Sequence, residues 1–156
     1  MKKQEENAIL FYEKEYYFLS NFSSFQVEWK GRLWQTSEHA YQASKFFCID
    51  EEIVEKIFNA RSAYDSKNIA KKHKEKMNQN FVLIKISIME DICKHKLQQH
   101  FYIQEKLLET NNRQLVENSP TATFWGCGEN KDGRNELGKI WMKLREELNN
   151  NKAMSL

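Results

Sequence analysis

The fold of this chain is decided around one stretch, which reads Thr36-Ser37-Glu38-His39-Ala40-Tyr41-Gln42-Ala43-Ser44-Lys45-Phe46. Thr36 or Ser37 can cap the start of a helix, because a hydroxyl oxygen accepts a hydrogen bond from a free backbone N–H of the first turn. Glu38 then falls in that first turn, where the partial positive charge of the helix N-terminus favours a carboxylate. The stretch therefore predicts a helix that begins at about residue 36 with an acidic side chain close to its start.

One face of this helix carries polar groups of several kinds. At about 100° per residue, the face of Glu38 is shared by Tyr41, Gln42 and Lys45. These groups can hold a polar ligand, and a solvated face with a carboxylate placed for the helix dipole is the alternative. His39 lies about 100° around the helix, which favours a packed or capping role over a catalytic one. It has no metal-ligand spacing with another His or Cys, so we expect no metal and no cofactor.

Short strands are expected on both sides of this helix. A hairpin is predicted over residues 25–34, because apolar residues alternate there with period two and Lys30-Gly31 can form the turn. Further short strands are predicted over residues 8–12 and 114–117. Together they indicate a small sheet beside the helices.

Most of the remaining chain has helical patterns. Asp50 can cap one helix, and Ser62 with Asp65 three residues later has capping-box spacing for another that ends near residue 74. Three more helices are predicted over residues 81–99, 102–108 and 135–149. The fold class is therefore mainly α, of the α+β kind, as a compact helical domain with a small N-terminal β-hairpin or sheet.

Length and charge limit the classes of protein that fit. A chain of 156 residues is long enough for one domain with its own core, which we place at residues 8–148 with a polar tail at 149–156. The net charge of +2 does not demand a polyanionic partner. A run of lysines between residues 67 and 76 can contact the phosphates of a nucleic acid, but a solvated face explains it as well.

Cysteine spacing and hydropathy indicate the compartment. Cys48, Cys93 and Cys127 are an odd number without a CxxC pair, which argues against a disulfide framework and a zinc site. Residues 1–6 lack the apolar run of a signal peptide, and no apolar stretch approaches the roughly 20 residues that cross a membrane. We therefore expect a soluble cytoplasmic protein with no membrane association.

A second dense block lies far from the first along the chain and begins Phe124-Trp125-Gly126-Cys127-Gly128. Glycines let a backbone approach a ligand closely, and Trp125 can offer a flat face to a base. A buried Trp behind a tight turn is the alternative for Trp125. Asn135, at the start of the last predicted helix, can be a simple N-cap.

The two blocks together resemble the NADAR family, the YbiA-like proteins that handle ADP-ribose and related N-glycosides. The resemblance runs from about residue 10 to residue 148. It implies an N-glycosidase that cleaves a bond to ribose and removes ADP-ribose from guanine bases or related ADP-ribosyl or phosphoribosyl substrates. Hydrolysis of a riboflavin-biosynthesis intermediate is one alternative, and a non-catalytic ADP-ribose-binding module is another. The partner is then an ADP-ribose-containing or phosphoribosyl small molecule, or ADP-ribosylated DNA or nucleotide.

The resemblance also implies roles for particular residues. Glu38 becomes the general acid/base, and Lys45 pairs with a phosphate. Trp125 and Phe81 stack on the base. Ser20, Asn21 and Asn135 bond the sugar or phosphates, although Ser20 and Asn21 can equally form only a turn. The other candidate substrate-binding residues are Phe22, Trp34, Gln42 and Gly126.

One departure from the family pattern concerns the chemistry. Ala122 stands three residues before the loop Trp, where the family commonly has an Asp that would act as a second catalytic carboxylate. By analogy with glycosidases, cleavage benefits from two carboxylates with divided roles. Three explanations are open: the activity is weakened or lost, Glu117 or Asp132 replaces the missing group, or an Asp has been exchanged for Ala122 in this sequence.

Two further departures concern packing and the base. Phe81 stands where YbiA-like glycosidases have a Trp, so a stacking face remains but the indole N–H donor does not. This departure bears on the riboflavin intermediate as substrate more than on the fold. Trp141 replaces a smaller aliphatic residue, which we interpret as a change in packing.

Overall fold

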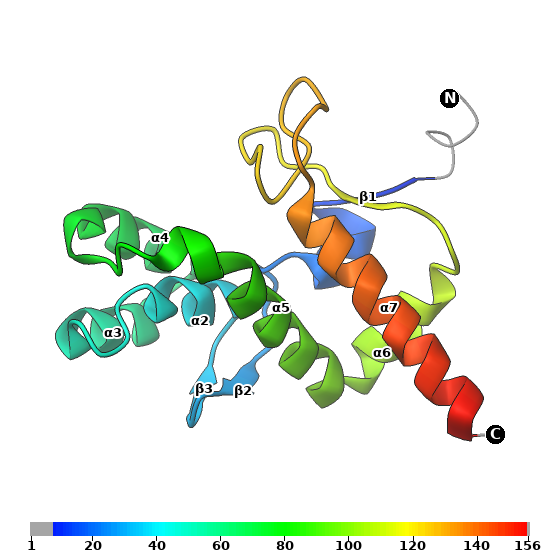
Figure 1. The fold of residues 1–156 in the computed structure, drawn as a ribbon, viewed down its shortest axis with the longest axis horizontal. Coiled ribbons are helices and arrows are strands. Elements are labelled where there is room, and N and C mark those ends of the chain that lie inside the picture. The colour runs from blue at the N-terminus through cyan, green and yellow to red at the C-terminus, as the bar shows by residue number, and fades with distance from the viewer. Residues whose placement is uncertain (1–7, 156) are drawn as a thin grey trace. The chain divides into compact units, whose positions relative to one another are not determined.

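The computed structural model describes residues 8–155 and is mainly helical, with short strands (Figure 1), which confirms the predicted fold class. The start of the chain, where a signal peptide was sought, lies outside the described residues. The chain divides into two compact units, one containing Met1–Ser20 with His100–Leu156 and the other Asn21–Gln99. One domain over the whole chain stays a prediction.

The unit Asn21–Gln99 consists of a hairpin followed by helices. In the hairpin, β2 and β3 pair antiparallel with Val27 opposite Trp34, in the predicted segment. Its elements are β2 (Val27–Trp29), β3 (Arg32–Trp34), α2 (Ser37–Ser44), α3 (Glu51–Phe58), α4 (Ala63–Lys72), the 3₁₀ helix η2 (Lys74–Lys76) and α5 (Phe81–Gln99).

Side-chain caps fix where three of these helices begin. Thr36, Asp50 and Ser62 each accept a hydrogen bond from the backbone N–H three residues further on. Each cap satisfies a donor that the helix itself leaves free. The predicted starts of α2, α3 and α4 are therefore confirmed, whereas α4 ends at Lys72, slightly before the predicted end.

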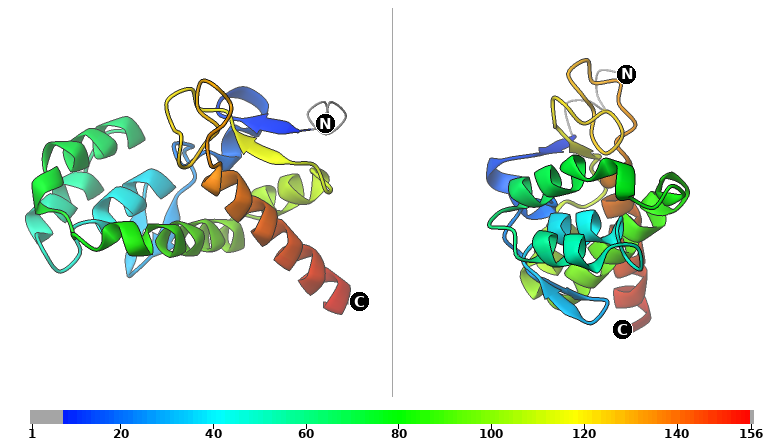
Figure 2. Two further views of the ribbon diagram at one scale, coloured as in Figure 1. Left: turned by 45° about the horizontal axis from the view of Figure 1, so that its top comes forward. Right: turned by 90° about the vertical axis from the view of Figure 1, so that its left-hand side faces the viewer.

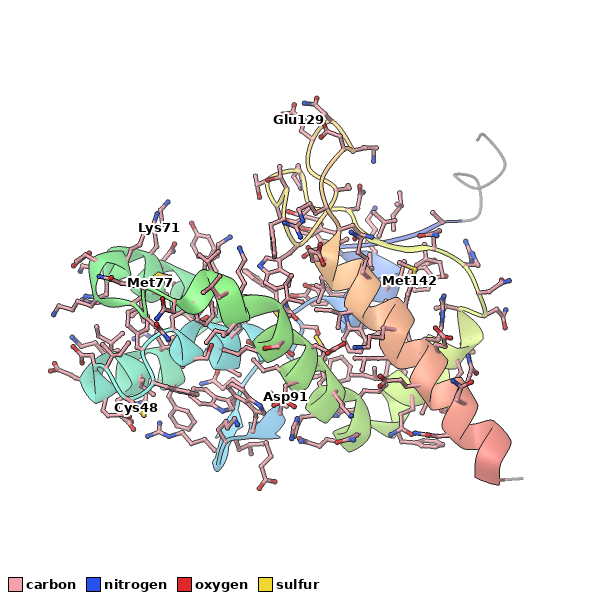
Figure 3. All side chains as sticks on the ribbon, in the orientation of Figure 1. Cys48, Lys71, Met77, Asp91, Glu129 and Met142 are labelled. Carbon is pink, nitrogen blue, oxygen red and sulfur yellow. The ribbon has the colours of Figure 1, made fainter. Side chains whose placement is uncertain are left out.

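Side-chain hydrogen bonds attach the hairpin to α5. The Gln99 amide accepts from the Glu28 backbone N–H at 2.7 Å and donates to the Glu28 carbonyl at 2.8 Å, as a strand neighbour would. Trp29 Nε1 donates to Asp91 Oδ2 at 2.8 Å, and Asp91 is labelled on α5 in Figure 3. Helix α5 is thus the support on which the hairpin of this unit rests.

The other unit combines a two-stranded parallel sheet with helices. Its elements are β1 (Ile9–Phe11), the 3₁₀ helix η1 (Lys14–Leu19), α6 (Phe101–Glu109), β4 (Leu115–Glu117) and α7 (Glu136–Ser155). Strands β1 and β4 lie side by side, with Ile9 opposite Leu115 (Figure 2). Trp141 of α7 is fully buried, and its Nε1 donates to the Leu19 carbonyl at 2.9 Å. This geometry agrees with our interpretation of Trp141 as a packing residue.

Two details of the sequence prediction were wrong or incomplete. The last helix was expected to end at residue 149 and leave a polar tail, but α7 continues to Ser155. Neither Gly nor Pro interrupts residues 149–155, so nothing in that segment stops the helix. The 3₁₀ helices were not predicted, because such short pieces have no apolar period of their own.

The described residues contain no helix that combines the length and apolar character needed to cross a membrane.

Candidate functional site

The Glu38 cluster, which we define as Asn21, Ser37, Glu38, Gln42 and Lys45, lies in the unit Asn21–Gln99. Glu38 is only 7% exposed although it carries a carboxyl group. Burial raises the pKa of Glu38 above its ordinary value, while the hydrogen bond from Gln42 and the positive charges of Lys67 and Lys45 act in the opposite direction. Glu38 therefore keeps its proton to a higher pH than an exposed Glu does, as a general acid requires.

The groups around Glu38 use their N–H donors within the protein. Gln42 Nε2 donates to Glu38 Oε1 at 2.7 Å, and the Glu38 backbone N–H donates to the Asn21 carbonyl at 3.0 Å. Asn21 Nδ2 donates to Met89 Sδ at 3.3 Å. The oxygen atoms Asn21 Oδ1, Ser37 Oγ and Gln42 Oε1 are buried and have no hydrogen-bond partner among the described residues. Buried acceptors of this kind are rare in folded proteins, so each of them calls for a partner, and a bound ligand is one that could supply it.

An aromatic pair and an ammonium group adjoin this cluster. The rings of Tyr41 and Phe81 lie 5.5 Å apart between centroids, and Lys45 Nζ lies 5.2 Å from the first and 5.8 Å from the second. Burial lowers the pKa of Lys45, an effect that the Glu38 charge opposes and the neighbouring lysines strengthen. The structure thus brings Glu38, Lys45 and Phe81 together, but Phe81 is only 2% exposed, and the phosphate contact of Lys45 and the stacking of Phe81 on a base stay predictions.

Two residues near the cluster have structural partners. His39 is fully buried between the Thr36 hydroxyl, 2.7 Å from Nδ1, and the Ala60 carbonyl, 3.0 Å from Nε2. This is the packed role favoured for His39. Trp34 is buried too, and its Nε1 donates to the Trp29 carbonyl at 2.9 Å. These contacts account for Trp34 without a ligand, and its contact with substrate stays a prediction.

The glycine–aromatic loop, residues 118–135, lies in the other unit. Trp125 is half-buried and meets Phe124 edge to face, with ring centroids 4.8 Å apart. Its carbonyl accepts from the Leu137 N–H at 3.1 Å, so the first turn of α7 fixes the backbone of Trp125. The Arg134 guanidinium lies 4.7 Å from the centre of the Phe124 ring. Trp125 is therefore held by its neighbours, and its stacking on a base stays a prediction.

Asn135 and Gly126 attach this loop to β4. Asn135 Nδ2 donates to the Leu115 carbonyl and its Oδ1 accepts from the Glu117 N–H, both at 2.9 Å. A side chain at Gly126 would place its Cβ 2.7 Å from the Glu117 carbonyl oxygen, so only glycine fits. Asn135 is therefore not simply an N-cap, and for both residues the sugar or ligand contact stays a prediction beside a clear structural role.

Strand β4, which directly precedes this loop, ends in a carboxyl group that lies near the Ala122 backbone. The site of a Cβ on Gly126 would lie 3.0 Å from Glu117 Oε2 and 3.1 Å from the Ala122 carbonyl oxygen. Glu117 and Ala122 therefore meet at one face of Gly126, and Glu117 Oε2 is buried. Asp132, by contrast, is exposed.

The remaining predicted residues are Ser20, the last residue of the N-terminal segment of one unit, and Phe22, near the start of the other. Ser20 is buried directly after η1, and Phe22 is half-buried. The contact of Asn21 with Met89 was not anticipated, since 68 residues separate them and no local pattern signals such a contact. Within the described part of the chain, no group of three or more His, Cys, Asp or Glu side chains could hold a metal ion.

A surface hollow of about 650 Å³ lies elsewhere in the unit Asn21–Gln99, along α3 and α4. Its polar lining residues are Lys56, Asn59, Arg61, Asp65, Asn68 and Lys72. None of the predicted site residues lines it, so we base the site on the chemistry of the Glu38 cluster and not on the size of this hollow.

Comparison with known proteins extends this picture. The chain is 39% identical over 146 residues to an N-glycosidase of Nostoc punctiforme, covering 92% of this chain and 94% of that protein. It is 35% identical over 145 residues to a riboflavin biosynthesis protein of Vibrio vulnificus, of which it spans only 39%.

A solved structure agrees with the sequence comparison. The NMR structure of the Escherichia coli protein YbiA matches with a TM-score of 0.85 and 32% identity, covering 94% of this chain and 87% of that one. That protein is named an N-glycosidase. The NADAR domain model matches residues 10–149. The predicted resemblance is thereby confirmed: this chain belongs to the NADAR family.

Proposed function

We propose that this chain is an N-glycosidase that hydrolyses the bond between ribose and a nitrogen base. The observation that carries the proposal is Glu38, a buried carboxyl group with a raised pKa that is oriented by Gln42 at 2.7 Å. A carboxyl group with these properties keeps a proton that it can give to a leaving group. The names of the Nostoc punctiforme and Escherichia coli relatives support the same reaction class.

The proposed reaction needs one proton donor and one water molecule. Protonated Glu38 gives its proton to the leaving nitrogen as the bond from the anomeric carbon to that nitrogen breaks. Water then adds to the oxocarbenium-like sugar, and the proton that this water loses returns to the Glu38 carboxylate. Lys45 pairs with a phosphate of the substrate. Stacking of the base on Phe81, whose ring is only 2% exposed and lies beside Tyr41, requires that ring to become uncovered.

Two substrate classes fit this chemistry. The first is an ADP-ribosylated guanine base, either free or in DNA, as the family resemblance implies. The second is a phosphoribosylamino-pyrimidine of riboflavin synthesis, which is supported by the name of the Vibrio vulnificus relative. Both present a ribose, a base and at least one phosphate, so the same residues serve either substrate.

Glu117 is our choice for the second carboxyl group that Ala122 does not provide. Its Oε2 lies at the same face of Gly126 as the Ala122 carbonyl, whereas Asp132 is exposed. The side chain of Glu is one methylene longer than that of Asp, which suits a group acting from a neighbouring position. If Glu117 has this role, Glu117→Gln lowers turnover, and Asp132→Asn leaves turnover unchanged.

A second candidate function is a module that binds ADP-ribose without cleaving it. Ala122 is the observation that favours it, because the family pattern has an Asp there. In this case Glu38 is retained for ligand binding, and no N-glycoside is hydrolysed at any pH.

The test is a hydrolysis assay on both substrate classes with the unaltered chain and its Ala122→Asp variant. We expect the unaltered chain to release the base from one class, and the restored Asp to raise that rate. Turnover only in Ala122→Asp would identify an inactivated N-glycosidase. Absence of turnover in both variants, together with calorimetric binding of ADP-ribose, would establish the binding module and refute the enzyme.

A further inference from the structure

One polar group of the Gln42 amide has a hydrogen-bond partner, and the other has none among the described residues. Its Nε2 donates to Glu38 Oε1 at 2.7 Å, whereas its Oε1 is buried without a partner among the described residues. The side chain is only 3% exposed. An unsatisfied buried acceptor lowers stability, so such a group is expected to gain its partner from a ligand.

The bond to Glu38 decides which end of the amide a ligand meets. With Nε2 donating to Glu38 Oε1, the proton of protonated Glu38 belongs on Oε2, where a leaving group can take it, whereas a turned amide would bind that proton with its own oxygen. The amide therefore stays with its nitrogen on Glu38 and presents its oxygen. This oxygen accepts a hydrogen bond from a hydroxyl or N–H group and cannot bind a phosphate oxygen.

We propose that Gln42 Oε1 accepts a hydrogen bond from the 2-hydroxyl of the ribose, the hydroxyl on the carbon next to the anomeric carbon. This inference rests on the proposed function, in which Glu38 acts at the anomeric bond. Gln42 is hydrogen-bonded directly to Glu38, so the group that binds Gln42 Oε1 lies beside the reacting bond. The 2-hydroxyl is the ribose donor nearest to that bond. Hydrogen bonds to this hydroxyl strengthen in glycosidase transition states, so Gln42 is a specificity-determining residue.

Asn21 repeats the pattern next to the start of α2. Its Nδ2 is bound to Met89 Sδ, its carbonyl accepts from the Glu38 N–H, and its Oδ1 is buried without a partner among the described residues. The Glu38 cluster is therefore rich in acceptors, and its cation, Lys45, is the group suited to an anion. This division of roles matches a ligand with hydroxyl donors at one part and a phosphate at another.

The test compares the binding of ribose 5-phosphate with that of 2-deoxyribose 5-phosphate by NMR titration of the full chain. The unaltered chain should bind ribose 5-phosphate about tenfold more tightly or better, because the deoxy compound leaves the Gln42 oxygen unsatisfied. Gln42→Leu should bring the two affinities to within about twofold of each other. The matched control Gln79→Leu, at an exposed glutamine of the same unit, should keep the original ratio.

Three results would overturn the inference: equal affinities in the unaltered chain, an unchanged ratio in Gln42→Leu, or no binding of either sugar phosphate. If Gln42→Leu does not fold, Gln42→Met, which has a similar size and no amide oxygen, should lose the preference, and its retention there would also overturn the inference. The ratio does not depend on turnover. A preference for ribose without hydrolysis of any N-glycoside would therefore refute the proposed function and leave the role of Gln42 standing.

Discussion

In the Glu38 cluster, amide groups donate within the protein and leave buried oxygen atoms without partners among the described residues, whereas in the glycine–aromatic loop both polar atoms of the Asn135 amide bind β4. The two regions carry the two halves of the family resemblance. An unsatisfied buried acceptor lowers stability, while a bonded amide that bridges a strand raises it. The comparison separates a region with unsatisfied buried acceptors, where we propose that the ligand binds, from Asn135 and Gly126, whose contacts with β4 already give them a structural role.

The largest expected effect tests the ligand-binding side of this comparison. Glu38→Gln removes the proton donor but keeps the size of the side chain, so turnover should fall about 10²–10⁴-fold. Steady-state kinetics measures the loss, and Glu75→Gln, at an exposed Glu of the same unit, is the matched control. Unchanged turnover in Glu38→Gln would remove Glu38 from the chemistry.

The same variant should alter the dependence of stability on pH. Since the folded-state pKa of Glu38 is raised, its contribution to stability is present at low pH and is lost as pH rises through that pKa. Relative to the unaltered chain, Glu38→Gln should therefore gain stability as the pH increases from 4.5 through the raised pKa of Glu38. Urea denaturation across this range measures the difference, and a difference independent of pH would contradict the raised pKa.

The next effect tests the structural side. Asn135→Ala removes two hydrogen bonds to β4 and places Ala at a φ of 53°, so the free energy of unfolding should fall by about 2–4 kcal/mol. Urea denaturation measures this loss, with the exposed loop residue Asn130→Ala as the control. A stable Asn135→Ala variant with a raised KM would instead place Asn135 at the substrate, as the resemblance implies.

The buried ammonium group of Lys96 allows a further comparison, between a buried charge and the buried uncharged acceptors of the Glu38 cluster. Lys96 of α5 is fully buried, its Nζ donates to Ser23 Oγ at 3.0 Å, and burial lowers the pKa of Lys96 from 10.5 to about 8. Between these values the unfolded chain binds more protons, so the free energy of unfolding should rise with pH from 8 to 10.5. Lys96→Met should remove this rise, which we expect to be about 1–3 kcal/mol.

Denaturation at several pH values between 7 and 10.5 checks the prediction for Lys96. The exposed neighbour Lys94→Met is the control, because it removes a lysine from the same helix without removing a buried ammonium group. If the free energy of unfolding changes with pH in the same way in the unaltered chain and in Lys96→Met, burial does not lower the pKa of Lys96.

The smallest effect concerns the aromatic face of the loop. If Trp125 stacks on the base, Trp125→Phe keeps most of that face, and KM should rise only about 2–5-fold, less than the loss for Trp125→Ala. Folding should be almost unaffected, because Trp125 is half-buried and its carbonyl, not its ring, bonds to Leu137. A kcat loss as large as that of Glu38→Gln would show that this loop also takes part in the chemistry.

Much of the secondary structure could be predicted because its signals are local. The caps Thr36, Asp50 and Ser62 act over three residues, and alternation within β2 and β3 acts over two. The end of α7 could not be predicted, because a polar segment without Gly or Pro is compatible with both a tail and a helix.

The candidate site divides in the same way. The shared face of Glu38, Gln42 and Lys45 follows from the helical period alone, and the structure joins the first two through a hydrogen bond. The buried state of Glu38 and the partners of Asn135 depend on residues distant in the chain, which no local pattern reveals.

The sequence by itself determined the family, the mainly helical fold class and the residues that carry chemical groups, because motifs, caps and periods are properties of neighbouring positions. Only the tertiary structure decided which of those groups are buried and which acceptor atoms have no hydrogen-bond partner among the described residues. Burial sets the pKa of Glu38, and internal hydrogen bonds leave Gln42 with its oxygen available. Both effects arise from packing between distant segments, where removal of water makes an unpartnered polar atom costly and therefore informative.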